Sequence, residues 1–458
     1  MANDVGQQMG ATDALMLRLE RSALLRSTIV QVAILDHAPD AQRLRDKVLQ
    51  GTAKVARFRQ VPVPTPIPGM PPTWVGAADF DVDYHLRFSR LRKPSGMRCL
   101  LDEAALIGVQ VFDPARPLWE SHIIEGLPDD RAAAIQKIHH ALGDGVSLLD
   151  IAMLFLDLER DPVTYAIEVA EPLLDFSSAL ARATSGLNAD AQALGRTLLS
   201  AAAGLANFAR HPSDSAASLT DTAKSLLRIA APGSGQLSPI MRGRSFGARF
   251  DALVVPLDEM KAAGRHVGGK LNTAFLAAVA GGLDRYHHHH GAPVAGLRCA
   301  MPVTTRDAAD KSLGNHFSPT RFVLPMTAAD PIERLQAARE LTESQQRESA
   351  LNLTGPMART LALLPSTLLV PAVEYVMRGI DVIVSNVRGA PLPVYVAGAR
   401  SLANFGFAPR GGAALNITMI SNMDEIHVAV NSDPEAIPDP VLLMACLQES
   451  FDEIRKVA

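Results

Sequence analysis

The chain has 458 residues and a formal net charge of −4 at pH 7, with 48% hydrophobic and 20% charged residues. This length exceeds what one hydrophobic core usually supports, so we expect two domains. The weak negative charge excludes the basic surface of a typical nucleic-acid-binding protein. The three cysteines lack CxxC spacing and the N-terminus lacks the pattern of a secretory signal, which together predict a cytoplasmic protein without disulfides or structural zinc.

Residues 1–165 predict alternating strands and helices. Apolar and polar residues alternate strictly over 80–88, which is typical of a half-buried strand. Strands at 121–125 and 132–138 flank a turn and predict a hairpin. Because tryptophan buries a large apolar area, we expect Trp119 to pack beneath the second strand of this hairpin.

Two histidines, an aspartate and a glycine follow that second strand: His139, His140, Asp144 and Gly145. Imidazole titrates near neutral pH, so a histidine at a strand end can take a proton from a hydroxyl group. Because neighbouring residues of a strand point to opposite faces, we expect one histidine to act as the base and the other to brace the strand. Asp144 can fold back to hold the backbone, and Gly145 suits a tight turn. A purely structural role is the alternative for a lone histidine, but the doubled histidine followed by Asp-Gly favours catalysis.

The composition shifts to Ala, Ser and Leu between about 166 and 245, which predicts helices that link two halves. Strands and helices then alternate again up to the end of the chain. The elements predicted there are strands 252–255, 297–301 and 380–384, helices 272–286, 331–349 and 439–455, and a hairpin of strands 413–420 and 425–430.

Two segments of the second half have competing interpretations. Residues 360–377 are unusually apolar, but prolines, a serine and a glutamate interrupt the run of about 18 apolar residues that a membrane-spanning helix needs. They predict either a core helix or a surface patch that meets lipid. Four consecutive histidines at 287–290 end a predicted helix, so we expect a solvated helix end there. Consecutive histidines cannot surround one metal ion, and no metal site is expected.

The motifs resemble a known family. His140-Ala-Leu-Gly-Asp144-Gly145 matches the HxxxDG signature of the CoA-dependent acyltransferase superfamily. The doubled histidine before it resembles the bacterial wax ester synthase/acyl-CoA:diacylglycerol acyltransferases. Further segments are similar to that family, in the family's order, along nearly the whole chain. They are residues 10–20, 79–86, 116–120, 381–389, 415–421 and 436–440.

The resemblance implies an α/β fold of two chloramphenicol-acetyltransferase-like domains with mixed sheets, at residues 1–165 and 246–458. A helical linker at 166–245 would join them, and an active-site tunnel would run between them. In such enzymes the residue equivalent to His140 deprotonates the acceptor alcohol, whose oxygen then attacks the thioester of acyl-CoA directly. Asp144 would be structural and pair with an arginine, for which Arg306 is a candidate. This mechanism uses acyl-CoA as a substrate and needs no cofactor or metal.

The C-terminal half contains candidate donors to the oxyanion of such a reaction. Ser385 and Asn386 follow an apolar run and precede a glycine, and each good oxyanion donor contributes on the order of 3 kcal/mol. An Asx-type turn is an equally open interpretation of the pair. Asn272 falls where the family carries Asn-Asp at a helix start. Thr273 replaces the acid here, although threonine is still acceptable at a helix start.

From the resemblance we expect an O-acyltransferase that moves a long-chain acyl group from acyl-CoA to diacylglycerol or, as second choice, to a long-chain alcohol. Its partners would be these substrates and the surface of a membrane or a lipid droplet, with peripheral contact and no nucleic acid. The alternatives are condensation from a carrier-protein thioester and a lipid-binding homologue with weak or no turnover. The sequence leaves the oligomeric state open.

Overall fold

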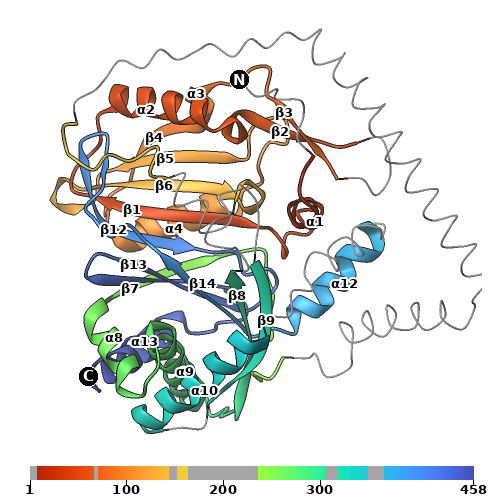
Figure 1. Cartoon of the computed structure of the whole chain (residues 1–458), viewed down its shortest axis with the longest axis vertical. Coiled ribbons are helices and arrows are strands. Elements are labelled where there is room, and N and C mark those ends of the chain that lie inside the picture. The colour runs from red at the N-terminus through yellow and green to blue at the C-terminus, as the bar shows by residue number, and fades with distance from the viewer. Residues whose placement is uncertain are drawn as a thin grey trace, which may run out of the picture.

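The computed structural model describes residues 8–65, 71–143, 152–162, 236–304, 317–326, 329–348 and 366–457. Within these ranges two six-stranded sheets form the core, one above the other in Figure 1. Each sheet contains both parallel and antiparallel neighbours, and helices pack against them. The mixed α/β fold predicted from the sequence is therefore confirmed.

The first sheet carries the histidine pair. Its strand order is β11-β12-β1-β6-β5-β4, and its neighbours are antiparallel except β4 and β5, which are parallel. The hairpin predicted at 121–138 is confirmed as β5 and β6. The strands are β1 (Thr28–Leu35), β4 (Leu86–Arg90), β5 (Trp119–Glu125), β6 (Ala132–His139), β11 (Tyr395–Val396) and β12 (Ala399–Phe407).

The second sheet has the order β7-β14-β13-β10-β8-β9. Strand β10 runs parallel to both β13 and β8, and the other neighbours are antiparallel. The second predicted hairpin is confirmed as β13 and β14. The strands are β7 (Arg249–Pro256), β8 (Gly296–Thr304), β9 (Phe317–Pro325), β10 (Val382–Arg388), β13 (Leu415–Asn422) and β14 (Glu425–Ser432); β2 (Gln60–Val63) and β3 (Thr73–Gly76) form a separate pair.

Helix α9 is the centre of the helical layer beside the second sheet, where it contacts α8, α10 and α13 (Figure 1). A Cβ at Gly282 would come within 2.8 Å of Leu447 Cα, so glycine permits the close approach of α13. The helices are α1 (Ala11–Leu19), α2 (Ala41–Lys54), α3 (Val82–His85), α4 (Met97–Val109), α8 (Leu257–His266), α9 (Leu271–His289), α10 (Pro331–Glu348), α12 (Ser366–Arg378) and α13 (Pro440–Arg455), with short 3₁₀ turns η1 (Ala56–Arg59), η2 (Pro128–Asp130) and η3 (His140–Leu142).

Strand β12 ties the two halves of the chain together. It comes from the C-terminal half but pairs with β1, from Val30↔Phe407 to Leu35↔Ser401, and it also contacts β13 and β14. The rings of Phe250 and Phe407 stack with centroids 4.0 Å apart in the core between the sheets. The domain limits 1–165, 166–245 and 246–458 stay a prediction, and most of the linker lies outside the described residues.

The structure corrects two expectations. The strand predicted at 80–88 is wrong in its first part, because Asp81 accepts a hydrogen bond from the amide of Asp83 at 2.9 Å and starts α3, so that the strand begins only at Leu86. The histidine run is not wholly solvated. His287 is fully buried, with Nε2 2.8 Å from Ser238 Oγ and Nδ1 2.8 Å from the carbonyl of Leu283. Of the helices in the described ranges, none combines the length and the apolar character needed to cross a bilayer.

Candidate active site

The histidine pair lies at the end of a central strand. Strand β6 runs between β1 and β5, and its last residue His139 is opposite Thr28. Small and branched apolar side chains bury the start of β6 in the core on both faces of the sheet. The chain then turns sharply, and His140 opens η3 with its amide donating to the carbonyl of Ser27 at 2.8 Å. The position of both histidines is therefore set by the backbone of β1.

His139 is held inside the protein. Its side chain is 1% exposed, and Nδ1 accepts a hydrogen bond from the amide of Ala141 at 3.0 Å. The proton of the neutral ring is therefore on Nε2, which faces Glu20 Oε1 at 3.1 Å. The same carboxylate oxygen accepts the amide of Ser27 at 2.5 Å. His139 thus fastens β6, η3 and the end of α1 to one another.

His140 is half-buried and so is more accessible than its neighbour. The carbonyl of His140 accepts the amide of Gly143 at 3.2 Å, which closes η3. Asp144, Gly145 and the candidate partner Arg306 lie outside the described residues, so their predicted roles stay predictions. The difference in burial between the two histidines is the arrangement expected if His139 braces the strand and His140 serves as the base.

A buried ion pair lies next to the histidines on β5 and β6. Glu120 and Lys137 are opposite each other, and Lys137 Nζ is 3.4 Å from Glu120 Oε1 although the lysine side chain is 0% exposed. Burial lowers the pKa of Lys137, and Glu120 opposes this shift. Burial alone would raise the pKa of Glu120, but the hydrogen bond from His122 and the charge of Lys137 lower it to about 2. The sequence motifs did not predict this ion pair. Glu120 belongs to the segment 116–120, which resembles the family, but nothing in the sequence singled out Lys137.

Phe112 connects the ion pair to the histidine. Its ring lies under Lys137 Nζ at 4.3 Å and meets the ring of His139 edge-on at 6.2 Å. On the opposite face of the sheet, Trp119 is buried and donates from Nε1 to the carbonyl of Phe58 at 2.8 Å. Its ring stacks on His85 with centroids 4.4 Å apart. The burial predicted for Trp119 is confirmed, and its position beneath the second strand of the hairpin stays a prediction.

The structure brings Asn272 and Asn386 together. Asn386 Nδ2 donates to Asn272 Oδ1 at 2.5 Å, and so links the strand β10 to the first turn of α9. Ser385, the residue before Asn386, is buried and is opposite Thr418 in the parallel pair of β10 and β13. The alternative of an Asx-type turn is wrong, because β10 continues through both residues to Arg388.

Thr273 supplies a helix cap where the family has an acid. Its Oγ1 accepts the amide of Lys270 at 3.3 Å and lies 3.4 Å from Thr342 Oγ1. This is the reciprocal half of a capping box, a role that a carboxylate at the same position could also fill. The substitution therefore keeps the start of α9 intact and leaves Asn272 in place.

Helix α1 lies between α12 and the histidine turn. Helix α1 contacts both η3 and α12, and Arg18 Nε donates to Ser366 Oγ at 3.3 Å. The outer side of α12 exposes Leu368 and Tyr375, at 63% and 59%. Of the predicted segment 360–377, the residues up to 365 lie outside the described ranges. Where the side chains of His, Cys, Asp and Glu are described, they form no group of three or more that could hold a metal ion.

Comparisons with known proteins define the family. Residues 9–275 match the wax ester synthase/diacylglycerol acyltransferase catalytic domain, and residues 313–455 match the C-terminal domain of the same proteins. The chain belongs to this family of acyltransferases. A Mycobacterium tuberculosis H37Rv relative, provisionally named a diacylglycerol O-acyltransferase, is 32% identical over 458 residues, which covers 99% of this chain and 93% of the relative. A second relative from the same strain, named in the same way, is 28% identical over 475 residues, covering 99% and 98%.

Solved structures share the fold. The wax ester synthase/diacylglycerol acyltransferase from Marinobacter aquaeolei VT8 aligns over 98% of both chains with a TM-score of 0.66 and 22% identity. The starter condensation domain of rhizomide synthetase, solved in complex with C8-CoA, aligns over 99% of this chain and 94% of that chain, with a TM-score of 0.59 and 14% identity. The two-domain fold inferred from the motifs is thus confirmed.

Proposed function

We propose that the chain transfers a long-chain acyl group from acyl-CoA to the hydroxyl group of diacylglycerol, forming triacylglycerol, or of a long-chain alcohol, forming a wax ester. This proposal rests on how the two histidines are held in a chain that belongs to a family of acyltransferases. His139 is locked in one tautomer at the end of β6, and His140 is the more accessible ring beside it. Such fixed geometry is what general base catalysis requires.

The proposed reaction is a direct transfer. His140 takes the proton of the acceptor hydroxyl as its oxygen attacks the thioester carbonyl, so a C–O bond forms and the carbonyl oxygen becomes an oxyanion. When this tetrahedral intermediate collapses, the C–S bond breaks and the imidazolium returns the proton to the CoA thiolate. Asp144 and Gly145 would hold the turn after His140. No cofactor or metal enters any of these steps.

The asparagine pair is the proposed support for the oxyanion. The hydrogen bond between Asn386 and Asn272 fixes both amide groups. Asn272 accepts this bond through Oδ1, so its NH₂ group takes no part in it. A preorganised donor of this kind contributes on the order of 3 kcal/mol to the transition state. Ser385 is buried on the opposite face of β10 from Asn386 and is the alternative candidate donor.

We also propose that α12 forms the contact with the lipid phase. Its exposed side carries Leu368, Pro371, Ala372 and Tyr375, which recur at helical spacing. Because α12 contacts α1 and α1 contacts η3, lipid bound there would lie close to the histidine turn. Peripheral attachment to a membrane or a lipid inclusion would bring a water-insoluble acceptor to the protein.

The test of the reaction is the release of free CoA from palmitoyl-CoA. The purified chain would be assayed with diacylglycerol, with hexadecanol and without acceptor, beside His140→Ala and the exposed control His288→Ala. We expect release that depends on the acceptor, falls about 10²- to 10⁴-fold in His140→Ala, and stays unchanged in His288→Ala. The better acceptor identifies the main product.

Two results would contradict the proposal. Release that His140→Ala leaves unchanged would exclude this histidine as the base. An absence of release with either acceptor, in a folded wild-type chain, would exclude acyl-CoA as the donor and direct attention to carrier-bound thioesters or to lipid binding.

A further inference from the structure

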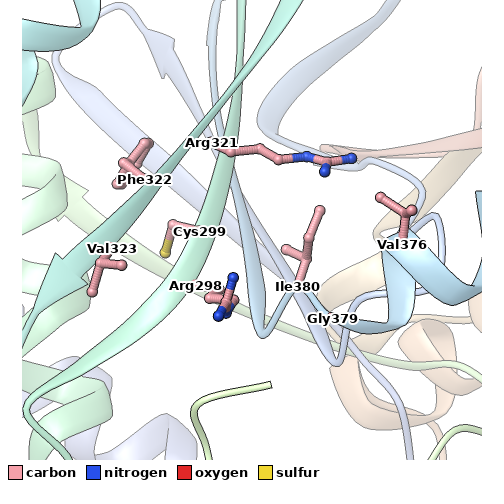
Figure 2. A pocket seen from close by; sticks show the side chains of 8 residues that line it. All are labelled: Arg298, Cys299, Arg321, Phe322, Val323, Val376, Gly379 and Ile380. Atoms are coloured by element: carbon pink, nitrogen blue, oxygen red, sulfur yellow. The ribbon is translucent and has the colours of Figure 1, made fainter. Parts of the chain in front are cut away.

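A hollow with two arginines opens on the second sheet. It encloses about 180 Å³ between the strands β8 and β9 and the junction of α12 with β10. Figure 2 shows the side chain of Arg321 extending toward Val376, with Arg298 on the neighbouring strand. The remaining lining residues are Cys299, Phe322, Val323, Gly379 and Ile380. Its only charged groups are therefore cationic, and the other walls are largely apolar.

Neither arginine is neutralised by an acid among the described residues. Among the described residues Arg298 Nε is buried without a hydrogen-bond partner, and Arg321 Nη2 lies 4.0 Å from Met377 Sδ. Burial lowers the pKa of Arg321, yet a guanidinium remains charged in proteins. Elsewhere in the same half, Arg410 meets Asp433 at 2.7 Å and Arg455 meets Glu259 at 2.9 Å. The pocket thus holds positive charge that its own residues leave uncompensated.

The carboxylate that contacts the backbone of Arg298 accepts its hydrogen bonds from backbone amides. Asp381 accepts the amides of Arg298, Leu237 and Ser238 at 2.8 to 3.2 Å and is fully buried. It therefore fixes the start of β10 and does not turn to the guanidinium. Two cations beside apolar walls, without a protein counter-ion, fit an anion that is attached to a less polar chain.

The pocket lies on the same face of the sheet as the candidate oxyanion residue. Ala300 is opposite Ile383 in the parallel pair of β8 and β10, so the side chains at alternate positions, Arg298 on β8 and Ser385 on β10, share that face. The amide of Asp381 donates to the carbonyl of Arg298, and Ser385 is four positions further along the chain than Asp381. At the rise of a strand this is about 13 Å.

We propose that this pocket binds the phosphate end of the acyl-CoA donor, with the pantetheine arm lying along the sheet toward Ser385. This inference rests on the proposed function and names where that substrate is held. Guanidinium groups bind phosphate oxygens in bidentate fashion, and apolar surroundings strengthen such contacts. An extended phosphopantetheine arm is longer than the distance along β10, so the thioester can reach the catalytic region while the phosphates stay between the arginines.

The direct test is the binding of CoA, dephospho-CoA and pantetheine to the full chain, measured by calorimetry. Arg298→Gln and Arg321→Gln are compared with Arg265→Gln, which removes an exposed arginine of α8. We expect the Kd for CoA to rise about tenfold to a hundredfold in the two pocket variants and to stay unchanged in the control. The Kd for pantetheine, which has no phosphate, should be the same in all four proteins. An unchanged Kd for CoA would overturn the proposal, and so would an equal loss for pantetheine.

Kinetics separate this proposal from that of the reaction. With palmitoyl-CoA the pocket variants should raise KM and leave kcat within about twofold, whereas palmitoyl-pantetheine should show the wild-type KM. If the wild-type chain turns over neither thioester, the proposed function fails while the calorimetry still reports on the pocket.

Binding to vesicles with and without phosphatidic acid tests whether the pocket holds a lipid headgroup instead. If the pocket variants lose binding to the anionic vesicles but keep the wild-type KM for palmitoyl-CoA, the pocket serves a lipid headgroup and the donor assignment is wrong.

Discussion

Two regions of this molecule differ in whether their buried charged groups are paired. Around the end of β6, three buried groups face a carboxylate: Lys137 and His122 face Glu120, and His139 faces Glu20. On the face of the second sheet beneath α12, Arg298 and Arg321 have no acidic partner among the described residues. A closed network fixes a geometry, whereas uncompensated charge in a hollow indicates something that binds there.

Mutations in the two regions should therefore affect stability differently. Removing one member of a closed buried pair leaves the other charged and unpaired, which costs far more than the pair itself contributes. Removing an arginine that has no acidic partner among the described residues leaves none of those residues unpaired. Stability measurements can therefore distinguish the regions before any activity is known.

The largest effect is expected for Glu120→Ala. This change leaves Lys137 in the core with no counter-ion, and it should lower the free energy of unfolding by about 3–5 kcal/mol in urea denaturation. The double variant Glu120→Leu/Lys137→Met should recover most of this loss. Glu125, on the same strand as Glu120, forms an exposed pair with Arg90 of the neighbouring β4, and Glu125→Ala should cost less than about 1 kcal/mol.

The matching experiment in the other region is Arg298→Met. We expect a change in the free energy of unfolding within about 0.5 kcal/mol, because the methionine keeps apolar contacts and no acid loses its partner. If Arg298→Met lowers the free energy of unfolding as much as Glu120→Ala does, Arg298 must have a partner and the two regions do not differ. A small loss in both variants would mean that Lys137 is solvated after the mutation.

A smaller effect is expected for Glu20→Ala. The variant loses the acceptor for the amide of Ser27 and the group facing His139, and it should lose about 1–3 kcal/mol of stability. Because His139 braces η3, kcat for acyl transfer should fall about tenfold with little change in KM. Glu20→Gln keeps an acceptor oxygen and should restore most of both quantities, while the exposed control Glu103→Ala should change neither. Equal losses in Ala and Gln variants would rule out this positioning role.

Local patterns in the sequence predicted much of this fold. Short, mostly apolar runs correctly located both hairpins, and the helical pattern from Asn272 located α9. The strand predicted at 80–88 failed because one side chain, Asp81, caps a helical turn and overrides the alternation. The pairing of β12 with β1 joins residues more than 360 positions apart, and no local pattern carries such information.

The candidate site shows the same limit. The doubled histidine was visible as a motif, but which ring is buried depends on the register of β6 against β1 and on Glu20. The pair of Glu120 and Lys137 exists only because β5 and β6 bring these residues opposite each other. Arg298 and Arg321 are likewise neighbours across β8 and β9, where Ala300 is opposite Arg321. Whether a charged residue has a partner therefore depends on the register of the strands, which local sequence patterns do not determine.

The smallest effect on stability, and one confined to lipid contact, is expected on α12. Leu368→Ser should leave the free energy of unfolding within about 0.5 kcal/mol, because the side chain is already in solvent. If that side chain enters lipid, the lost transfer free energy of about 1.5–3 kcal/mol should weaken binding to triolein emulsions by about tenfold or more. Val441→Ser, on α13, removes an equally exposed apolar side chain from another helix and should bind as the wild type does. Equal binding by both variants would move the lipid-facing surface away from α12.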